Sequence, residues 1–173
     1  MSSRTWTWPA VAIAGAAVTD ALLRVPFLYV GLSPDEGGYA YVAQQWARGA
    51  RLYGPAAWVD RPQGLMLAYR FLLSIAHGPW AVRMGALACG VGITMLLGTI
   101  GWMLEGPWTG AAAAVVYAIV GVAPHVQGFT FNGELAAALP ATGAVAAAVV
   151  WRKSRTSGWL VVAGLAGATA VLM

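Results

Sequence analysis

Six charged side chains gather between residues 33 and 63 of this chain, although charged residues make up only 9% of its 173 positions. They include three of the chain's six acidic residues. In order they are Asp35, Glu36, Arg48, Arg51, Asp60 and Arg61. A carboxylate can accept the proton of an attacking hydroxyl, and an arginine can bind phosphate oxygens through its planar fork. The pattern therefore suits group transfer from a phosphate ester.

A sugar carried on a lipid phosphate fits this chemistry better than a glycoside does. Its leaving group is already an anion and needs a cation rather than a general acid, so one carboxylate and one or two arginines are sufficient. Glycoside hydrolysis would ask for two opposed carboxylates.

The remainder of the chain is apolar enough to lie in a membrane. Hydrophobic residues make up 60% of it, and the mean hydropathy is +0.69. Basic residues are scattered, without a basic face or interleaved aromatics, which argues against nucleic acid as a partner. We expect an all-α membrane protein with a multi-span helical bundle. The predicted spans are 9–30, 80–103, 108–123, 135–151 and 158–173, with an outer loop at 31–79.

Two apolar segments differ from ordinary spans. Residues 64–77 are short, and Arg70 lies in their middle, so we expect a helix that lies against the bundle or is partly re-entrant. Residues 158–173 are apolar to the last position without a polar flank, so we expect the chain to be the truncated N-terminal part of a longer protein. A cleaved signal peptide is the competing interpretation of the first span.

Basic loops favour the cytoplasm, which predicts the orientation. With Arg4 inside, four crossings return the basic loop at 152–155 to the cytoplasm. The loop at 31–79 and the polar break at 124–134 then face outward together. Asp35, Glu36 and Glu134 are therefore predicted on one face of the membrane.

The outer loop should place its charges on helices. Ser33 and Glu36 match a capping box, which predicts a helix over 34–47 with a stripe of Tyr39 and Trp46 along the membrane surface. Asp60-Arg61-Pro62 resembles a second helix start.

Residues 33–72, SPDEGGYAYVAQQWARGARLYGPAAWVDRPQGLMLAYRFL, resemble the first outer loop of the GT-C membrane glycosyltransferases. The similarity is to protein O-mannosyltransferases, lipid A aminoarabinose transferases and the RgtA/B/C/D-like domain. It rests on an Asp-Glu pair after one span, a Tyr-containing helix, a basic-Pro motif, an Arg near the start of the next span (Arg83) and a later acidic loop residue.

The resemblance implies inverting transfer from a polyprenyl-phosphate-linked sugar to a hydroxyl of a lipid, glycan or protein, on the outer face of the cytoplasmic membrane. It covers only the N-terminal part of the family's many-span fold, so we expect this fragment to be inactive by itself. By position, Asp35 is the catalytic base and Glu36 its companion, a supporting or metal-site carboxylate. Arg61 would contact the lipid phosphate, and Glu134 would help to bind the acceptor or a metal, with Tyr39 and Gln63 also on the substrate side. The sequence departs from the family in having Gln63 after Pro62 and Gly37-Gly38 after the acidic pair.

Each of these residues also has a structural interpretation. Asp35, Glu36 and Glu134 could cap helices, and Arg61 could reach the interface from a buried stem. Asp20 and Arg24, four apart in the first span, could neutralise one another.

Other functions stay open at this level. The chain could be a non-catalytic membrane subunit or lipid-carrier-binding module, or a small transporter, although a transporter would need more polar residues at mid-membrane. No His, Cys or carboxylate pair has closed metal spacing, so no metal ligand is predicted, and a divalent metal enters only through the resemblance.

Overall fold

Residues 7–173 are described by a computed structural model, and within this range they form only helices and connecting turns. The helices are α1 (Thr7–Arg24), α2 (Pro34–Ala47), α3 (Gln63–Ile75), α4 (Pro79–Glu105), α5 (Pro107–Val120), α6 (Gly133–Ser154) and α7 (Gly158–Val171). Two short 3-10 turns, Val25–Phe27 and Pro124–Val126, lie between them. The predicted all-α class is confirmed.

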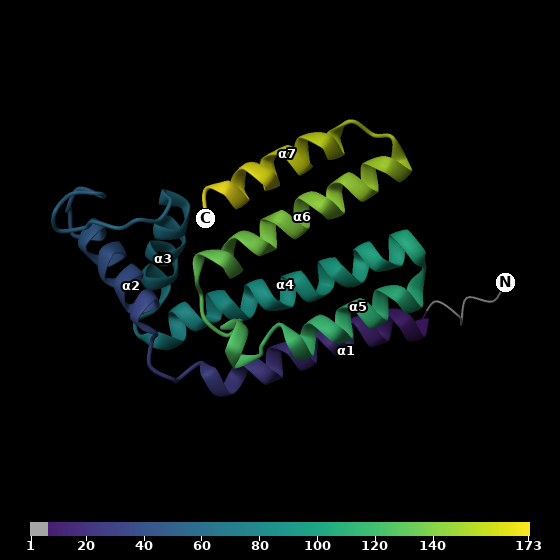
Figure 1. The fold of residues 1–173 in the computed structure, drawn as a ribbon, viewed down its shortest axis with the longest axis horizontal. Coiled ribbons are helices and arrows are strands. Elements are labelled where there is room, and N and C mark those ends of the chain that lie inside the picture. Colours follow the sequence, from purple (N-terminus) through teal and green to yellow (C-terminus); the bar gives the residue numbers. More distant parts are fainter. Residues whose placement is uncertain (1–6) are drawn as a thin grey trace.

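The bundle consists of helices that run side by side, namely α1, α4, α5, α6 and α7, whereas α2 and α3 lie apart at one end of it (Figure 1). Helix α4 packs on α1, α5 and α6, and α7 packs on α6. The break between α5 and α6 reaches the same end of the bundle as α2 and α3 (Figure 1). The turn from α4 to α5 and the connection from α6 to α7 lie at the opposite end.

Three helical segments are long and apolar enough to cross a membrane: Thr7–Phe27, Pro79–Glu105 and Gly133–Ser154. In an apolar stretch of 18 residues taken from each segment, only 22% to 28% of the residues are buried inside the protein. Most of their surface therefore faces outward, as lipid-facing surface does. Helices α5 and α7, at the other two predicted spans, have 14 residues each. At 1.5 Å per residue such a helix is roughly 21 Å long, short of the ~30 Å hydrocarbon core.

Small residues allow the close approach of α4 and α5. A Cβ atom added at Gly110 would lie 2.3 Å from the backbone oxygen of Gly98, and Gly101 lies against the backbone of Gly110. Contacts of this kind require glycine, because the obstructing atoms belong to the main chain. They are typical of helices that pack in a membrane, where small residues let backbones meet.

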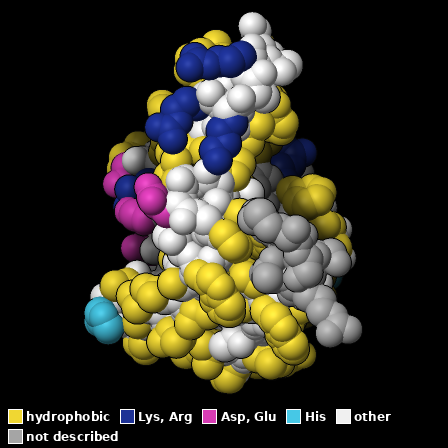
Figure 2. Space-filling view, turned by 90° about the vertical axis from the view of Figure 1, so that its right-hand side faces the viewer, with side chains coloured by type: hydrophobic (Ala, Val, Ile, Leu, Met, Phe, Trp, Pro, Cys, Tyr) yellow, Lys and Arg dark blue, Asp and Glu magenta, His cyan; other side chains and the backbone are white. Residues whose placement is uncertain are grey.

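Basic side chains gather at the far end of the bundle (Figure 2). Arg152, Lys153 and Arg155 are exposed where α6 gives way to α7. Arg4, whose charge predicted a cytoplasmic N-terminus, lies outside the described residues.

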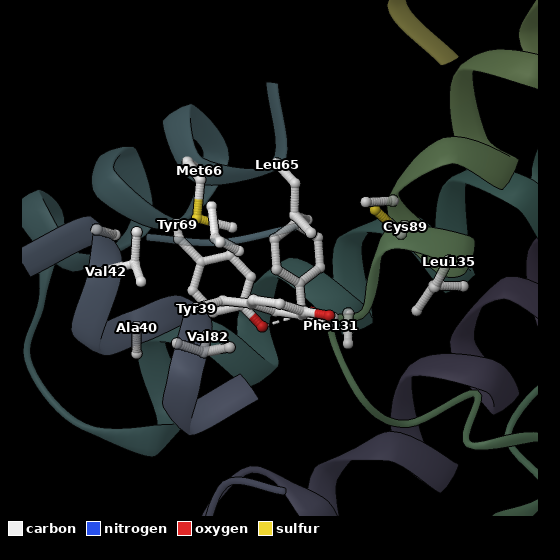
Figure 3. Packing of buried hydrophobic residues seen from close by; sticks show 14 of the residues in the cluster. Tyr39, Ala40, Val42, Leu65, Met66, Tyr69, Val82, Cys89, Phe131 and Leu135 are labelled. Carbon is white, nitrogen blue, oxygen red and sulfur yellow. Dashed lines mark hydrogen bonds between the residues drawn. The ribbon is translucent and has the colours of Figure 1, made fainter. Parts of the chain in front are cut away.

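The main core joins α2 and α3 to the bundle (Figure 3). Tyr39 of α2 and Tyr69 of α3 meet edge to face with ring centroids 5.6 Å apart, and Tyr69 also packs on Phe131 from the break. The stripe of Tyr39 and Trp46 was predicted to lie along the membrane. In the structure Tyr39 is buried against α3, and Trp46 is partly buried against the same core. Both side chains of the stripe therefore contact α3, Tyr39 through Tyr69 and Trp46 through Arg70.

Candidate functional site

The start of α2 is fixed by a complete capping box, as predicted. The Ser33 hydroxyl accepts a hydrogen bond from the backbone N–H of Glu36, and the Glu36 carboxylate accepts one from the N–H of Ser33. Successive helical residues point about 100° apart. Asp35 is therefore exposed, whereas Glu36 turns inward and is fully buried.

Glu36 is the centre of a buried network that joins three segments. Its Oε2 lies 2.9 Å from Nη2 of Arg83 in α4, and its Oε1 accepts a hydrogen bond of 2.8 Å from the backbone N–H of Phe131. With Ser33, three partners satisfy this carboxylate. A buried charge of this kind is costly unless it is paired and hydrogen-bonded, and here it is both.

Arg83 extends the network to the break. It donates to the backbone oxygens of Phe129 (2.9 Å) and Gly31 (3.1 Å), and its guanidinium lies 5.0 Å from the ring centroid of Phe129. Phe129 in turn stacks on Phe27 at 4.4 Å. The break is thus held against the beginning of α2.

A second buried ion pair holds the break from the side of α1. Nε of Arg24 lies 3.1 and 3.2 Å from the two carboxylate oxygens of Asp20, as their spacing predicted. The same guanidinium donates to the backbone oxygens of Gly121 and Gly128. A Cβ atom at Gly90 would lie 2.3 Å from this guanidinium, so glycine leaves the room that Arg24 occupies. These contacts pair the two buried charges and hold the break, which supports a structural role for Arg24 and Asp20.

The networks bring three predicted site residues into one open hollow. Asp35, Arg61 and Glu134 line a space of about 300 Å³ beside the break. An adjoining hollow of about 420 Å³, between α2 and the loop before α3, shares Asp35 and Arg61 and is also lined by Tyr39. Small-molecule sites commonly have volumes of about 300–1,000 Å³. Asp35 and Arg61 therefore stand where the two spaces meet.

Arg61 is held from two sides. Its Nε donates to the Tyr39 hydroxyl at 2.9 Å, while the Tyr53 hydroxyl donates to its backbone oxygen at 3.1 Å. The hydrogen bond to Tyr39, and then the negative charges of Glu134 and Asp60, raise the pKa of the Arg61 guanidinium above its usual value. The Asp60 carboxylate is 4.0 Å away and 72% exposed, so this pair is loose. Arg61 stays a cation with donors free for an anion.

Glu134 lies in the first turn of α6 and is exposed. The N-cap of this helix is Asn132, whose side chain accepts a hydrogen bond of 2.8 Å from the N–H of Leu135. Glu134 is therefore not needed as the cap that its position in the sequence suggested. Gln63 is exposed at the first position of α3 and lines neither hollow.

The first hollow also contains residues that sequence reasoning did not assign to the site. They are His125, Val126, Gln127 and Asn132, all from the break. The signal was the polar composition of the segment between two apolar helices. It did not reveal that the break folds back over the start of α2.

The residues of the hollow do not make a metal centre on their own. Within residues 7–173, no group of three or more His, Cys, Asp or Glu side chains is placed to hold a metal ion. The Glu36 oxygens are occupied by Arg83 and backbone donors.

The chain matches no family model, no curated protein and no solved structure.

Proposed function

We propose that the chain is an integral membrane glycosyltransferase that moves a sugar from a polyprenyl-phosphate donor to an acceptor hydroxyl, with inversion, on the outer face of the cytoplasmic membrane. The observation that carries the proposal is the position of Asp35 and Arg61 together on the border of two open hollows. Asp35 offers a base and Arg61 offers a ligand for the phosphate, and the transfer requires both groups.

In this mechanism the donor phosphate binds the guanidinium of Arg61, which is a cation at any physiological pH. The acceptor hydroxyl lies between Asp35 and the residues of the break. As the hydroxyl oxygen attacks the anomeric carbon, its proton passes to the Asp35 carboxylate, and the bond to the phosphate oxygen breaks. The polyprenyl phosphate leaves as an anion stabilised by Arg61. Attack on the side opposite the leaving group gives inversion.

The two carboxylates of the acidic pair have different places in this mechanism. Asp35 is exposed and has no hydrogen-bond or ion-pair partner among residues 7–173, so its oxygens are free to accept a proton. Glu36 is the companion carboxylate, and it holds α2 and the break in register. Glu134, with Asn132 and Gln127, supplies polar groups for the acceptor.

The first experiment offers the full-length wild-type protein in proteoliposomes a panel of polyprenyl-phosphate hexoses and pentoses, with membrane extract as acceptor. Release of free polyprenyl phosphate, together with sugar transfer to the extract, is the expected result. Donor binding without release from any member of the panel would contradict transfer. That outcome would support a non-catalytic lipid-carrier-binding module, which needs Arg61 but not Asp35.

A further inference from the structure

A third hollow lies between α2 and α3, away from the candidate site. It has a volume of about 490 Å³ and shares no lining residue with the two hollows that Asp35 borders. Three of its lining residues are basic or can become so: Arg48, Arg70 and His77. Gln44 and Ser74 add polar groups, and no acidic residue lines it.

The two arginines are not neutralised by the protein. Within residues 7–173 neither forms an ion pair with a carboxylate. Arg70 is held by stacking, with its guanidinium 4.9 Å from the ring centroid of Trp46, which leaves the N–H donors at its edge free. Arg48 follows the last turn of α2, where a cation is favourable to the helix dipole. Arg70 has no such reason to stand in an otherwise apolar helix. Two free guanidinium groups around one hollow are suited to a phosphate.

An exposed apolar stripe runs along α3 beside this hollow. Leu67, Phe71 and Ile75 recur every four residues and are 50%, 64% and 68% exposed. At 100° per residue, Arg70 and Ser74 lie on the helix surface next to this stripe. Helix α3 has only 13 residues, too few to cross a bilayer. A short helix with cations beside an apolar stripe is typical of one that lies in the membrane interface.

We propose that the hollow between α2 and α3 binds the phosphate of an anionic phospholipid headgroup. Arg48 and Arg70 are the phosphate ligands, with Gln44, Ser74 and His77 around them. Leu67, Phe71 and Ile75 enter the acyl layer next to the bound lipid. The two arginines alone could also bind a soluble phosphate, but the apolar stripe places the hollow at the depth of the lipid headgroups. The bound lipid would fix α2 and α3 on the membrane surface.

The test uses the full chain in nanodiscs containing phosphatidylglycerol and phosphatidylcholine, followed by native mass spectrometry of the released protein. Wild type should retain phosphatidylglycerol in preference to phosphatidylcholine. The double variant Arg48→Gln/Arg70→Gln should lose this retention about tenfold or more, because two charge-assisted contacts are removed. Arg48→Lys/Arg70→Lys should keep most of it, because the charge remains and only the planar fork is lost.

Arg51→Gln is the matched control. Arg51 is exposed in the loop after α2 and lines none of the three hollows. It should retain phosphatidylglycerol as wild type does. Equal retention by the Arg48→Gln/Arg70→Gln variant would overturn the proposal. Displacement of the lipid by excess inorganic phosphate would also overturn it, since the hollow would then be a soluble-anion site.

Discussion

Arg83 of α4 and Glu36 of α2 form a fully buried ion pair, with Nη2 and Oε2 separated by 2.9 Å. The pair is the point where the first loop, the long helix α4 and the break before α6 are tied together. Its backbone contacts, from Glu36 to Phe131 and from Arg83 to Phe129, set the position of the break. The pair therefore positions the residues that line the site, although neither of its side chains lines the site itself.

Removal of one partner of this pair should be strongly destabilising. Arg83→Met leaves the Glu36 carboxylate charged and without its cation, and loss of a single partner in a buried pair typically costs about 3–5 kcal/mol. We expect a large fall in the midpoint of thermal unfolding of the detergent-solubilised chain, measured by circular dichroism.

A double-mutant cycle provides the control. Glu36→Gln/Arg83→Met removes both charges and should be less destabilised than the sum of its single variants. Strict additivity would show that the two side chains do not stabilise one another.

The phenol of Tyr69 should make the fold sensitive to alkali. Its hydroxyl donates to the backbone oxygen of Phe131 at 2.5 Å, and burial, followed by the charge of Glu36, raises the pKa of Tyr69 well above its usual value. The folded state thus holds this proton more tightly than the unfolded state, whose pKa is about 10. The stabilisation is complete below about pH 10 and is lost as the pH rises further.

Tyr69→Phe tests the predicted direction of this pH dependence directly. The variant should lose about 1 kcal/mol at neutral pH through the missing hydrogen bond, yet its stability should fall less steeply than that of wild type above about pH 10. Urea unfolding at a series of pH values gives the comparison. Parallel curves for the two proteins would exclude Tyr69 as a source of alkaline sensitivity.

Single cysteines can test whether the two halves of the site share one side of the membrane. In a Cys89→Ala background, cysteines replacing Gly37 and Gly133 should react with an impermeant maleimide from the same side. A Cβ atom at Gly37 meets nothing within 4 Å, and one at Gly133 meets only ordinary contacts, so both changes fit the fold.

Ser154→Cys is the reference for the opposite side, because Ser154 is the exposed last residue of α6, within the basic segment at 152–155. It should react only after the membrane is opened or from the other face. Labelling of positions 37 and 133 from opposite sides would contradict the placement of Asp35 and Glu134 in one site.

Local patterns predicted much of this fold. The capping box of Ser33 and Glu36, the start of α3 after Pro62 and the pair of Asp20 and Arg24 depend on neighbours within four residues. Such contacts follow from helix geometry, so a sequence reveals them. Of the five spans predicted from the apolar lengths, three fall on helices that are long and apolar enough to cross a membrane, and the other two fall on helices of 14 residues.

Long-range partners could not be predicted in this way. Glu36 was expected beside Asp35 in the site, and nothing in the local pattern indicated that it would face inward to Arg83, 47 positions later. The contribution of His125 and Gln127 to the hollow depends on how the break folds, which Arg24 and Arg83 determine from two other helices. Trp46 was assigned to the membrane surface because its packing partner α3 is a separate element.

The most direct measurement of the central claim is sugar transfer by the Asp35→Asn variant of the full-length protein in proteoliposomes, with Glu105→Gln at the opposite end of the bundle as the control. The Asp35 side chain is exposed and supports no buried contact, so the variant should insert and fold as wild type does. We predict that Asp35→Asn releases no polyprenyl phosphate above background while still binding the donor through Arg61, and that Glu105→Gln retains full transfer. Unchanged transfer by Asp35→Asn would contradict the account, because the proposed base would then be dispensable.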